Sequence, residues 1–179
     1  MRPGRAAAIL ALAAACARSA WPAVYLTQDK ALALAFAAGT TVERTAVFLT
    51  DAQLSKAREL AGTGVKVESA LVTRYTGRDA GGRLVGTAYF DTHRVRTLDE
   101  TLMVVVDPDG RVARVEVLAF GEPPEYLEKR GWLEQFLGRR LDDEMSVKRG
   151  IRGITGATLS SQAATDAVRR VLAIHGALR

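Results

Sequence analysis

The residues best suited to chemistry in this sequence lie in segment 153–161, Gly-Ile-Thr-Gly-Ala-Thr-Leu-Ser-Ser, close to the C-terminus. Small residues flanked by hydroxyl side chains let a backbone turn approach a ligand closely. A helical pattern follows directly, and the first turn of a helix offers free N–H groups and the positive end of the helix dipole, which suit a phosphate group. The same hydroxyls are also ordinary helix caps, since Thr158, Ser160 and Ser161 could each accept a hydrogen bond from a first-turn amide.

Other kinds of chemistry have less support in the sequence. His93 and His175 are not spaced with Cys, Asp or Glu as metal ligands usually are, so we predict no metal site. Ser160, His93 and several aspartates are present, but no pattern pairs them as a catalytic triad, and we predict no catalytic residue. The sequence contains no Gly-x-Gly-x-x-Gly or Walker-type loop.

The composition is typical of one globular domain with a substantial core. Of the 179 residues, 48% are hydrophobic and 25% are charged, which argues against disorder. The formal net charge is +5, but Arg2, Arg5 and Arg18 lie in an N-terminal segment without acidic residues. The other basic residues alternate with acidic ones, so we predict no nucleic-acid partner.

The N-terminus has the form of a secretory signal. Residues 1–5 are short and cationic, and residues 6–15 are apolar but too short to span a membrane as a finished helix. Small residues follow, and Ala20 and Ala23 are suitable cleavage sites. We therefore predict a signal peptide over residues 1–23.

The single cysteine, Cys16, leaves a second interpretation of this signal open. Cys16 directly follows an apolar stretch, as in lipoprotein signals, although Ala13 stands where a large apolar residue is usual. Either Cys16 becomes acylated and anchors the protein to a membrane, or it is discarded with the signal. In both cases we expect residues 24–179 to form one domain outside the cytoplasm, in the periplasm.

The spacing of apolar residues predicts an α+β fold. Period-two patterns indicate strands, and helical spacing indicates helices that bracket them. The expected strands lie within residues 40–50, 65–68, 71–75, 84–92, 102–106 and 112–120. The expected helices cover residues 27–38, 51–60, 125–137 and 160–177, with Arg169 and Arg170 outside the apolar stripe of the last one. We expect residues 142–154 to be irregular.

Turn signals decide how the strands connect. The Gly-rich stretch 77–82 and the Asp-Pro-Asp-Gly stretch 107–110 are typical of hairpin turns. Between residues 65 and 120 the patterns do not alternate between strand and helix. We therefore predict an antiparallel meander of about four or five strands flanked by helices, with the C-terminal helix directly after the turn that contains Thr158.

Residues 155–158, Thr-Gly-Ala-Thr, resemble the Ser/Thr-Gly-Ala-Thr motif of the FMN-binding domain found in the small flavin subunits of the Rnf and Na+-translocating quinone reductase complexes. The motif lies one helix from the C-terminus, as in that family. Residues 120–126, Phe-Gly-Glu-Pro-Pro-Glu-Tyr, look like the Glu-Pro stretch that follows the sheet in its stand-alone members. The resemblance covers most of residues 24–179. One departure is Arg152, where the family usually has an acidic residue.

The resemblance implies a function and a set of site residues. In that family the last Thr of the motif carries FMN through a phosphoester bond, and Thr158 holds that position here. The implied protein is an exported electron carrier with covalent FMN rather than a stand-alone enzyme. Its implied partners are a separate flavin transferase that uses FAD and a membrane redox complex or another electron donor or acceptor. The motif residues expected to bind the cofactor are Thr155, Gly156, Ala157, Thr158, Leu159 and Ser160.

Residues outside the motif are further candidates with two readings each. Tyr126 or Trp132 could pack against the flat face of a flavin ring, or simply pack their segment onto the sheet. Glu122 could accept a hydrogen bond from a ribityl hydroxyl or the uracil N–H, or cap the helix that follows. The basic residues just before the motif could neutralise the phosphate or form a solvated loop: Lys148, Arg149 and Arg152.

Two alternative functions stay open at this point. One is an exported binding or assembly module of the same fold without flavin. The other is a flavin reductase with dissociable FMN. The colour of the denatured protein distinguishes them from a carrier with covalent flavin.

Overall fold

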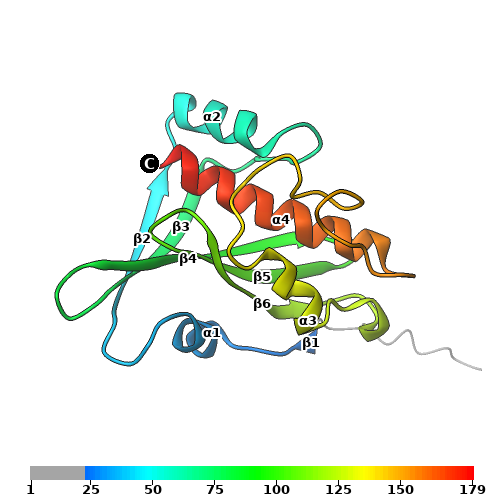
Figure 1. The fold of residues 1–179 in the computed structure, drawn as a ribbon, viewed down its shortest axis with the longest axis horizontal. Coiled ribbons are helices and arrows are strands. Elements are labelled where there is room, and N and C mark those ends of the chain that lie inside the picture. The colour runs from blue at the N-terminus through cyan, green and yellow to red at the C-terminus, as the bar shows by residue number, and fades with distance from the viewer. Residues whose placement is uncertain (1–22) are drawn as a thin grey trace, which may run out of the picture.

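A computed structural model of the chain describes residues 23–179. The predicted cleavage site after Ala20, Cys16 and nearly all of the predicted signal lie outside the described residues. The described chain folds into an antiparallel sheet with helices on both faces, which confirms the predicted α+β fold (Figure 1). Within residues 23–179, none of the helices is both long enough and apolar enough to cross a membrane.

The six strands of the described sheet are arranged in the order β1-β6-β5-β4-β3-β2. The strands are β1 Ala23–Val24, β2 Thr41–Phe48, β3 Leu71–Arg78, β4 Leu84–Arg94, β5 Asp99–Val106 and β6 Val112–Phe120. The helices are α1 Gln28–Ala35, α2 Asp51–Ala61, α3 Arg130–Leu133 and α4 Thr158–Ala177, with short 3-10 helices η1 Pro124–Tyr126 and η2 Glu134–Phe136.

Strands β3 to β6 form the predicted meander, because each pairs antiparallel with the next. Strand β2, which precedes α2, also pairs antiparallel with β3 and extends the sheet. Two of its turns end at glycines with a positive φ, 78° at Gly82 and 80° at Gly110, a conformation that strains other residues. Residues 95–98 form the turn between β4 and β5, closed by a 3.0 Å hydrogen bond from Val95 N to Leu98 O. This turn brings one end of the sheet close to the start of α4.

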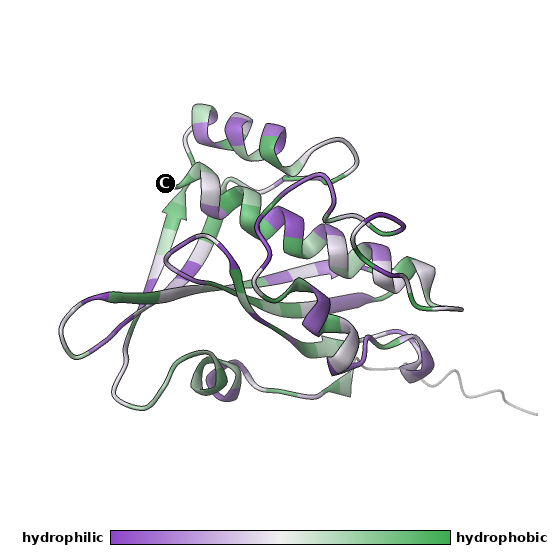
Figure 2. Ribbon diagram, viewed as in Figure 1, coloured by the Kyte–Doolittle hydropathy of each residue, from purple (hydrophilic) through white to green (hydrophobic). Residues whose placement is uncertain are grey.

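The sheet has a hydrophobic layer on each face. Helix α4 covers one face and α2 packs on α4, whereas α1 covers the other face (Figure 1). Leu102 and Val104 of β5 join the core under α4, and Met103 and Val105 join the core over α1. Covering both faces explains why residues 102–106 of this strand are all apolar. The central strands are accordingly hydrophobic and the tip of the β3–β4 hairpin is hydrophilic (Figure 2).

Helix α4 fixes the position of the segment in front of it. Ala164, Ala167 and Val168 are fully buried against the core. Arg169 was expected outside this stripe, but the structure contradicts that prediction, since the residue is 9% exposed. Its guanidinium donates to the carbonyl oxygens at the end of α2 and in the loop before the motif: Ala61, Asp142 and Met145.

Two local predictions were wrong for identifiable reasons. The expected helix over 125–137 is broken into η1, α3 and η2, because Leu127 and Lys129 have extended backbones that turn Glu128 into the interior. Residues 65–68 do not form a strand. The carbonyls of Lys66 and Val67 instead accept hydrogen bonds from arginines. The last helix begins at residue 158, two residues earlier than expected.

Candidate functional site

A cavity of about 210 Å³ lies where the start of α4 meets the end of the sheet. Its walls come from three parts of the chain that are far apart in sequence. The β4–β5 turn contributes Val95 and Arg96, and the segment after β6 contributes Glu122 and Tyr126. The motif and the start of α4 contribute Gly156, Ala157, Thr158, Leu159 and Ser160.

A compact hydrogen-bonded turn presents the motif. Gly156 has a φ of 83°, which favours glycine. Ala157 N donates to Ile154 O at 3.0 Å. The Ser161 hydroxyl accepts from Ile154 N and donates to Ala157 O, both at 2.9 Å. The Ser161 side chain therefore links the turn to α4 by hydrogen bonds.

The N-terminus of α4 is open to an external acceptor. Among residues 23–179, no side chain caps this helix by a hydrogen bond. The N–H groups of Thr158, Leu159 and Ser160 occupy its first turn and have no acceptor within the helix. Together with the helix dipole they can bind an anion such as a phosphate. None of the three expected caps, Thr158, Ser160 and Ser161, accepts a hydrogen bond from a first-turn amide. The Ser161 hydroxyl instead bonds to Ile154 and Ala157 within the turn.

The motif residues differ in their exposure. Thr155, Gly156 and Thr158 are exposed, whereas Ala157 and Ser160 are buried. Leu159 is 56% exposed, although it is apolar. The hydroxyl-bearing Thr158 is therefore accessible both to the cavity and to another protein, which a modified residue requires.

The two aromatic candidates have different surroundings. Tyr126 lines the cavity. Trp132 is not among the described residues that line it, and its ring packs edge-on against Phe136 with centroids 5.4 Å apart. The Trp132 indole N–H donates to Arg152 O at 2.5 Å. Trp132 thus holds the main chain just before the motif.

Glu122 is buried and holds the β4–β5 turn. Its Oε1 accepts hydrogen bonds from Thr97 N at 2.6 Å, Leu98 N at 2.8 Å and the Thr97 hydroxyl at 3.1 Å. The backbone N–H groups of Thr97 and Leu98 hold the pKa of Glu122 below its usual value. The carboxylate therefore fixes one wall of the cavity rather than capping the helix that follows it.

The cation at the cavity was not found from the sequence. Lys148, Arg149 and Arg152 are exposed and are not among the described residues that line it. Arg96 does line it. It lies 62 positions before Thr158 along the sequence, so no local pattern connects the two. A hairpin prediction with its turn at 95–98 would have placed Arg96 at the sheet end that faces the motif.

The site has the features of a pocket for a ligand with a phosphate group and a flat ring. The helix N-terminus and Arg96 suit the phosphate, and Tyr126 offers an aromatic surface. In the described residues, no group of three His, Cys, Asp or Glu side chains is arranged to hold a metal ion. The domain is thus of a class that would hold an organic phosphate at the start of α4.

Comparison with known proteins agrees with this class. Residues 99–173 match the model of the family described as the FMN-binding domain. A search of curated proteins gave no match. The crystal structure of Shewanella oneidensis NqrC is similar over 72% of this chain and 77% of that one, with a TM-score of 0.53 and 17% identity.

The two positive comparisons carry different weight. At 17% identity, the likeness to NqrC shows a shared fold. The family match covers β5, β6, the Glu122–Tyr126 segment and most of α4, including the motif. The family match thus supports FMN binding, and the likeness to NqrC supports the fold.

Proposed function

We propose that this protein is an exported electron carrier in which FMN is attached to the Thr158 hydroxyl oxygen through a phosphoester bond. One observation carries the proposal. The exposed Thr158 begins α4, beside the free N–H groups of the first helical turn and on the wall of the cavity that Arg96 and Tyr126 also line. A phosphate bound to this hydroxyl would lie where the helix dipole favours a negative charge.

The lining residues suit the parts of FMN. The first-turn amides and Arg96 would neutralise the phosphodiester, and Gly156 allows the backbone to approach it closely. Tyr126 would pack against the isoalloxazine ring. When bound, FMN supplies the electron-accepting chemistry, and the protein tunes it through packing and hydrogen bonds.

The size of the cavity is consistent with a tethered cofactor. At about 210 Å³, it is smaller than the roughly 300 Å³ or more of typical ligand pockets. It would therefore enclose only part of FMN, and partial enclosure gives weak noncovalent binding. Outside the cytoplasm a weakly held cofactor would be lost by dilution, and a covalent bond prevents that loss.

Attachment requires a second protein. We propose a flavin transferase that uses FAD, because the chain has no nucleotide-binding loop of a recognised kind. In this reaction the pyrophosphate bond of FAD breaks, the bond between the Thr158 oxygen and the FMN phosphorus forms, and AMP leaves. The hydroxyl proton is released. The exposure of Thr158 gives a transferase access to this oxygen.

Export and the electron partners complete the proposal. The signal-like segment 1–23 would be removed or, if Cys16 is acylated, would leave a membrane anchor. The electrons would pass between a membrane redox complex and an acceptor, in keeping with the family resemblance and the likeness to NqrC. The intact mass of the exported protein and labelling with a fatty acid distinguish the two forms of the N-terminus.

Co-expression with an FAD-dependent flavin transferase in an export-competent host tests the proposal. The wild-type protein should be yellow and stay yellow after denaturation. Thr158→Ala should be colourless with unchanged circular dichroism, whereas the neighbouring Thr155→Ala should retain its flavin. A yellow colour lost on denaturation would indicate a reductase with dissociable FMN. A colourless protein, beside a flavinylated positive control, would indicate a module without flavin.

A further inference from the structure

Two buried carboxyl groups have oxygen atoms without a hydrogen-bond partner. Glu100 on β5 is 0% exposed, and Glu128, between η1 and α3, is 2% exposed. In residues 23–179, four buried side-chain nitrogen or oxygen atoms lack a hydrogen-bond partner. Three of these four atoms are Glu100 Oε1 and both carboxyl oxygens of Glu128. A buried polar atom without a partner is costly, so this arrangement needs an explanation.

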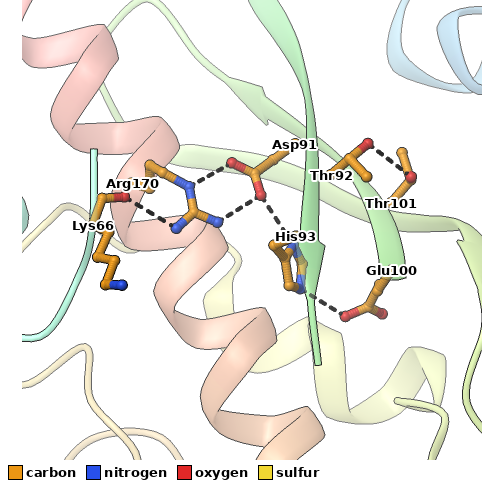
Figure 3. A network of polar contacts seen from close by, with 7 residues as sticks. All are labelled: Lys66, Asp91, Thr92, His93, Glu100, Thr101 and Arg170. Atoms are coloured by element: carbon orange, nitrogen blue, oxygen red, sulfur yellow. Dashed lines mark hydrogen bonds and ion pairs between the residues drawn. The ribbon is translucent and has the colours of Figure 1, made fainter. Parts of the chain in front are cut away.

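A chain of ion pairs leads to Glu100 from Arg170 of α4 (Figure 3). The Arg170 guanidinium donates twice to Asp91, at 2.7 Å for each bond. His93 links Asp91 to Glu100, with 3.0 Å from Nδ1 to Asp91 Oδ1 and 3.0 Å from Nε2 to Glu100 Oε2. Glu100 thus uses Oε2 for His93 and leaves Oε1 free.

The charges along this chain already balance. Arg170 and a protonated His93 are positive, and Asp91 and Glu100 are negative. Two further carboxylates act on these ion pairs: Asp166 of α4 faces Arg170 and His93, and Glu68 faces Arg170. An ionised Glu128 would therefore add a buried negative charge with no partner of its own.

A proton on Glu128 resolves the imbalance. Burial raises the pKa of Glu128 to about 9, and the neighbouring charge of Glu100 acts in the same direction, against the opposing charge of His93. The protonated carboxyl has an O–H donor, and the free Oε1 of Glu100 is an acceptor. One proton between the two carboxyls gives both of them a partner.

We propose that Glu100 and Glu128 form a buried proton-binding site, and that their shared proton fastens the segment 122–129 to the sheet as a wall of the cavity. Two peptide units separate Glu128 from Tyr126, so their Cα atoms are at most about 7.6 Å apart. Glu122 holds the other end of the same segment through Thr97 and Leu98. Glu128 is thus a positioning residue for Tyr126.

Loss of the proton should release this wall. When the O–H bond of Glu128 breaks, the proton passes to solvent and two carboxylates face each other in the interior. Their repulsion and the desolvation of the second charge favour outward movement of Glu128. The inference rests on the proposed function only where it assigns the cavity to flavin. The two carboxyls bind their proton in the protein without cofactor as well.

Carbon NMR of the glutamate carboxyls tests the proton site directly, in protein made without a transferase. In the wild-type protein, Glu128 should be protonated at neutral pH and titrate in the alkaline range. Glu100→Gln should lower the pKa of Glu128 by about one unit or more, because it removes the like charge. Glu125→Gln, an exposed change in the same segment, should leave it unchanged. An ionised Glu128 at neutral pH, or one unaffected by Glu100→Gln, would overturn the proposal.

Quenching of Trp132 fluorescence by acrylamide tests the fastening. Trp21→Phe as background leaves Trp132, four positions after Glu128, as the remaining tryptophan. Quenching should rise as the wild-type protein passes through the titration of Glu128. In Glu128→Gln, quenching should stay low both below and above the pH at which Glu128 titrates. The glutamine amide N–H donates to Glu100 and does not titrate.

The outcomes of the quenching experiment are distinct. In Glu128→Ala, the fluorescence of Trp132 should be quenched strongly at every pH. If that variant does not fold, the result for Glu128→Gln still tests the proposal. A Glu128→Gln protein whose quenching rises with pH as in the wild type would refute the fastening role. Because both experiments use protein without flavin, failure of covalent attachment at Thr158 leaves their results unchanged.

Discussion

The replacement of His93 by glutamine should destabilise the protein more at neutral and acid pH than at alkaline pH. His93 lies between Asp91 and Glu100, and its side chain is 9% exposed. Burial alone would lower its pKa, but the hydrogen bonds and charges of Asp91 and Glu100 outweigh burial and raise the pKa from 6.5 to about 9. The folded protein therefore binds this proton more tightly than the unfolded chain does.

The size of the effect follows from that difference in pKa. A shift of about 2.5 units corresponds to roughly 3 kcal/mol of stability. Because the folded pKa is the higher one, this contribution is complete below about pH 6.5 and disappears as the pH rises through about 9. Glutamine cannot bind the proton, so His93→Gln lacks the contribution at every pH.

Urea unfolding of both proteins between about pH 6 and pH 10 measures the effect. The difference in the free energy of unfolding should shrink by roughly 3 kcal/mol across this range. A difference that stays constant would refute the reasoning, because it would show that His93 carries no stabilising charge.

His175 provides a matched control. Burial and the charges of Arg179 and Arg74 lower its pKa to about 4. The residue is thus neutral in the folded protein above about pH 7, and so is an ordinary histidine in the unfolded chain. The effect of His175→Gln, which removes the hydrogen bond to Tyr89, should therefore be constant between about pH 7.5 and 10.

Three further substitutions test how the site is held, each by urea unfolding. Gly156→Ala should lower stability by about 1 kcal/mol because its φ is 83°, whereas Gly131→Ala in α3 should not, since a Cβ there meets nothing within 4 Å. Trp132→Phe should cost about 1 kcal/mol by removing the N–H donor to the carbonyl before the motif, and no loss would argue against this anchor. Arg169→Met should cost about 3 kcal/mol or more because it leaves the buried carbonyls of Ala61 and Met145 without donors. The control Arg149→Met, at an exposed position, should have little effect on stability. Equal losses of stability in the two variants would contradict the role given to the Arg169 hydrogen bonds.

Local patterns predicted most of the fold. The turn at 107–110 and the apolar run at 102–106 identify a central hairpin, because turn chemistry and strand periodicity are both properties of short segments. The prediction of one helix over 125–137 was wrong because burial of Glu128 overrides the local helical pattern. The predicted strand over 65–68 does not form because its carbonyls accept hydrogen bonds from Arg58 of α2 and from Arg170, which is distant in sequence.

The site was predictable to the extent that its parts carry local sequence patterns. Residues 156–160 of the motif region, Glu122 and Tyr126 were all expected at the site, and all of them line the cavity. Arg96 and the pairing of His93 with Glu100 depend on the register of the β4–β5 hairpin, in which residues 93 and 100 are opposite each other. That register requires the turn at 95–98, which has no glycine or proline to mark it.

Mass spectrometry of one tryptic peptide tests the central claim most directly. Cleavage after Arg152 and Arg169 releases residues 153–169, which contain the whole motif. In protein exported from cells with an active FAD-dependent transferase, this peptide should carry the mass of FMN less one water, and fragmentation should assign it to Thr158. An unmodified peptide beside a flavinylated positive control would contradict covalent attachment, and flavin on Thr155, Ser160 or Ser161 would contradict the assignment of the residue.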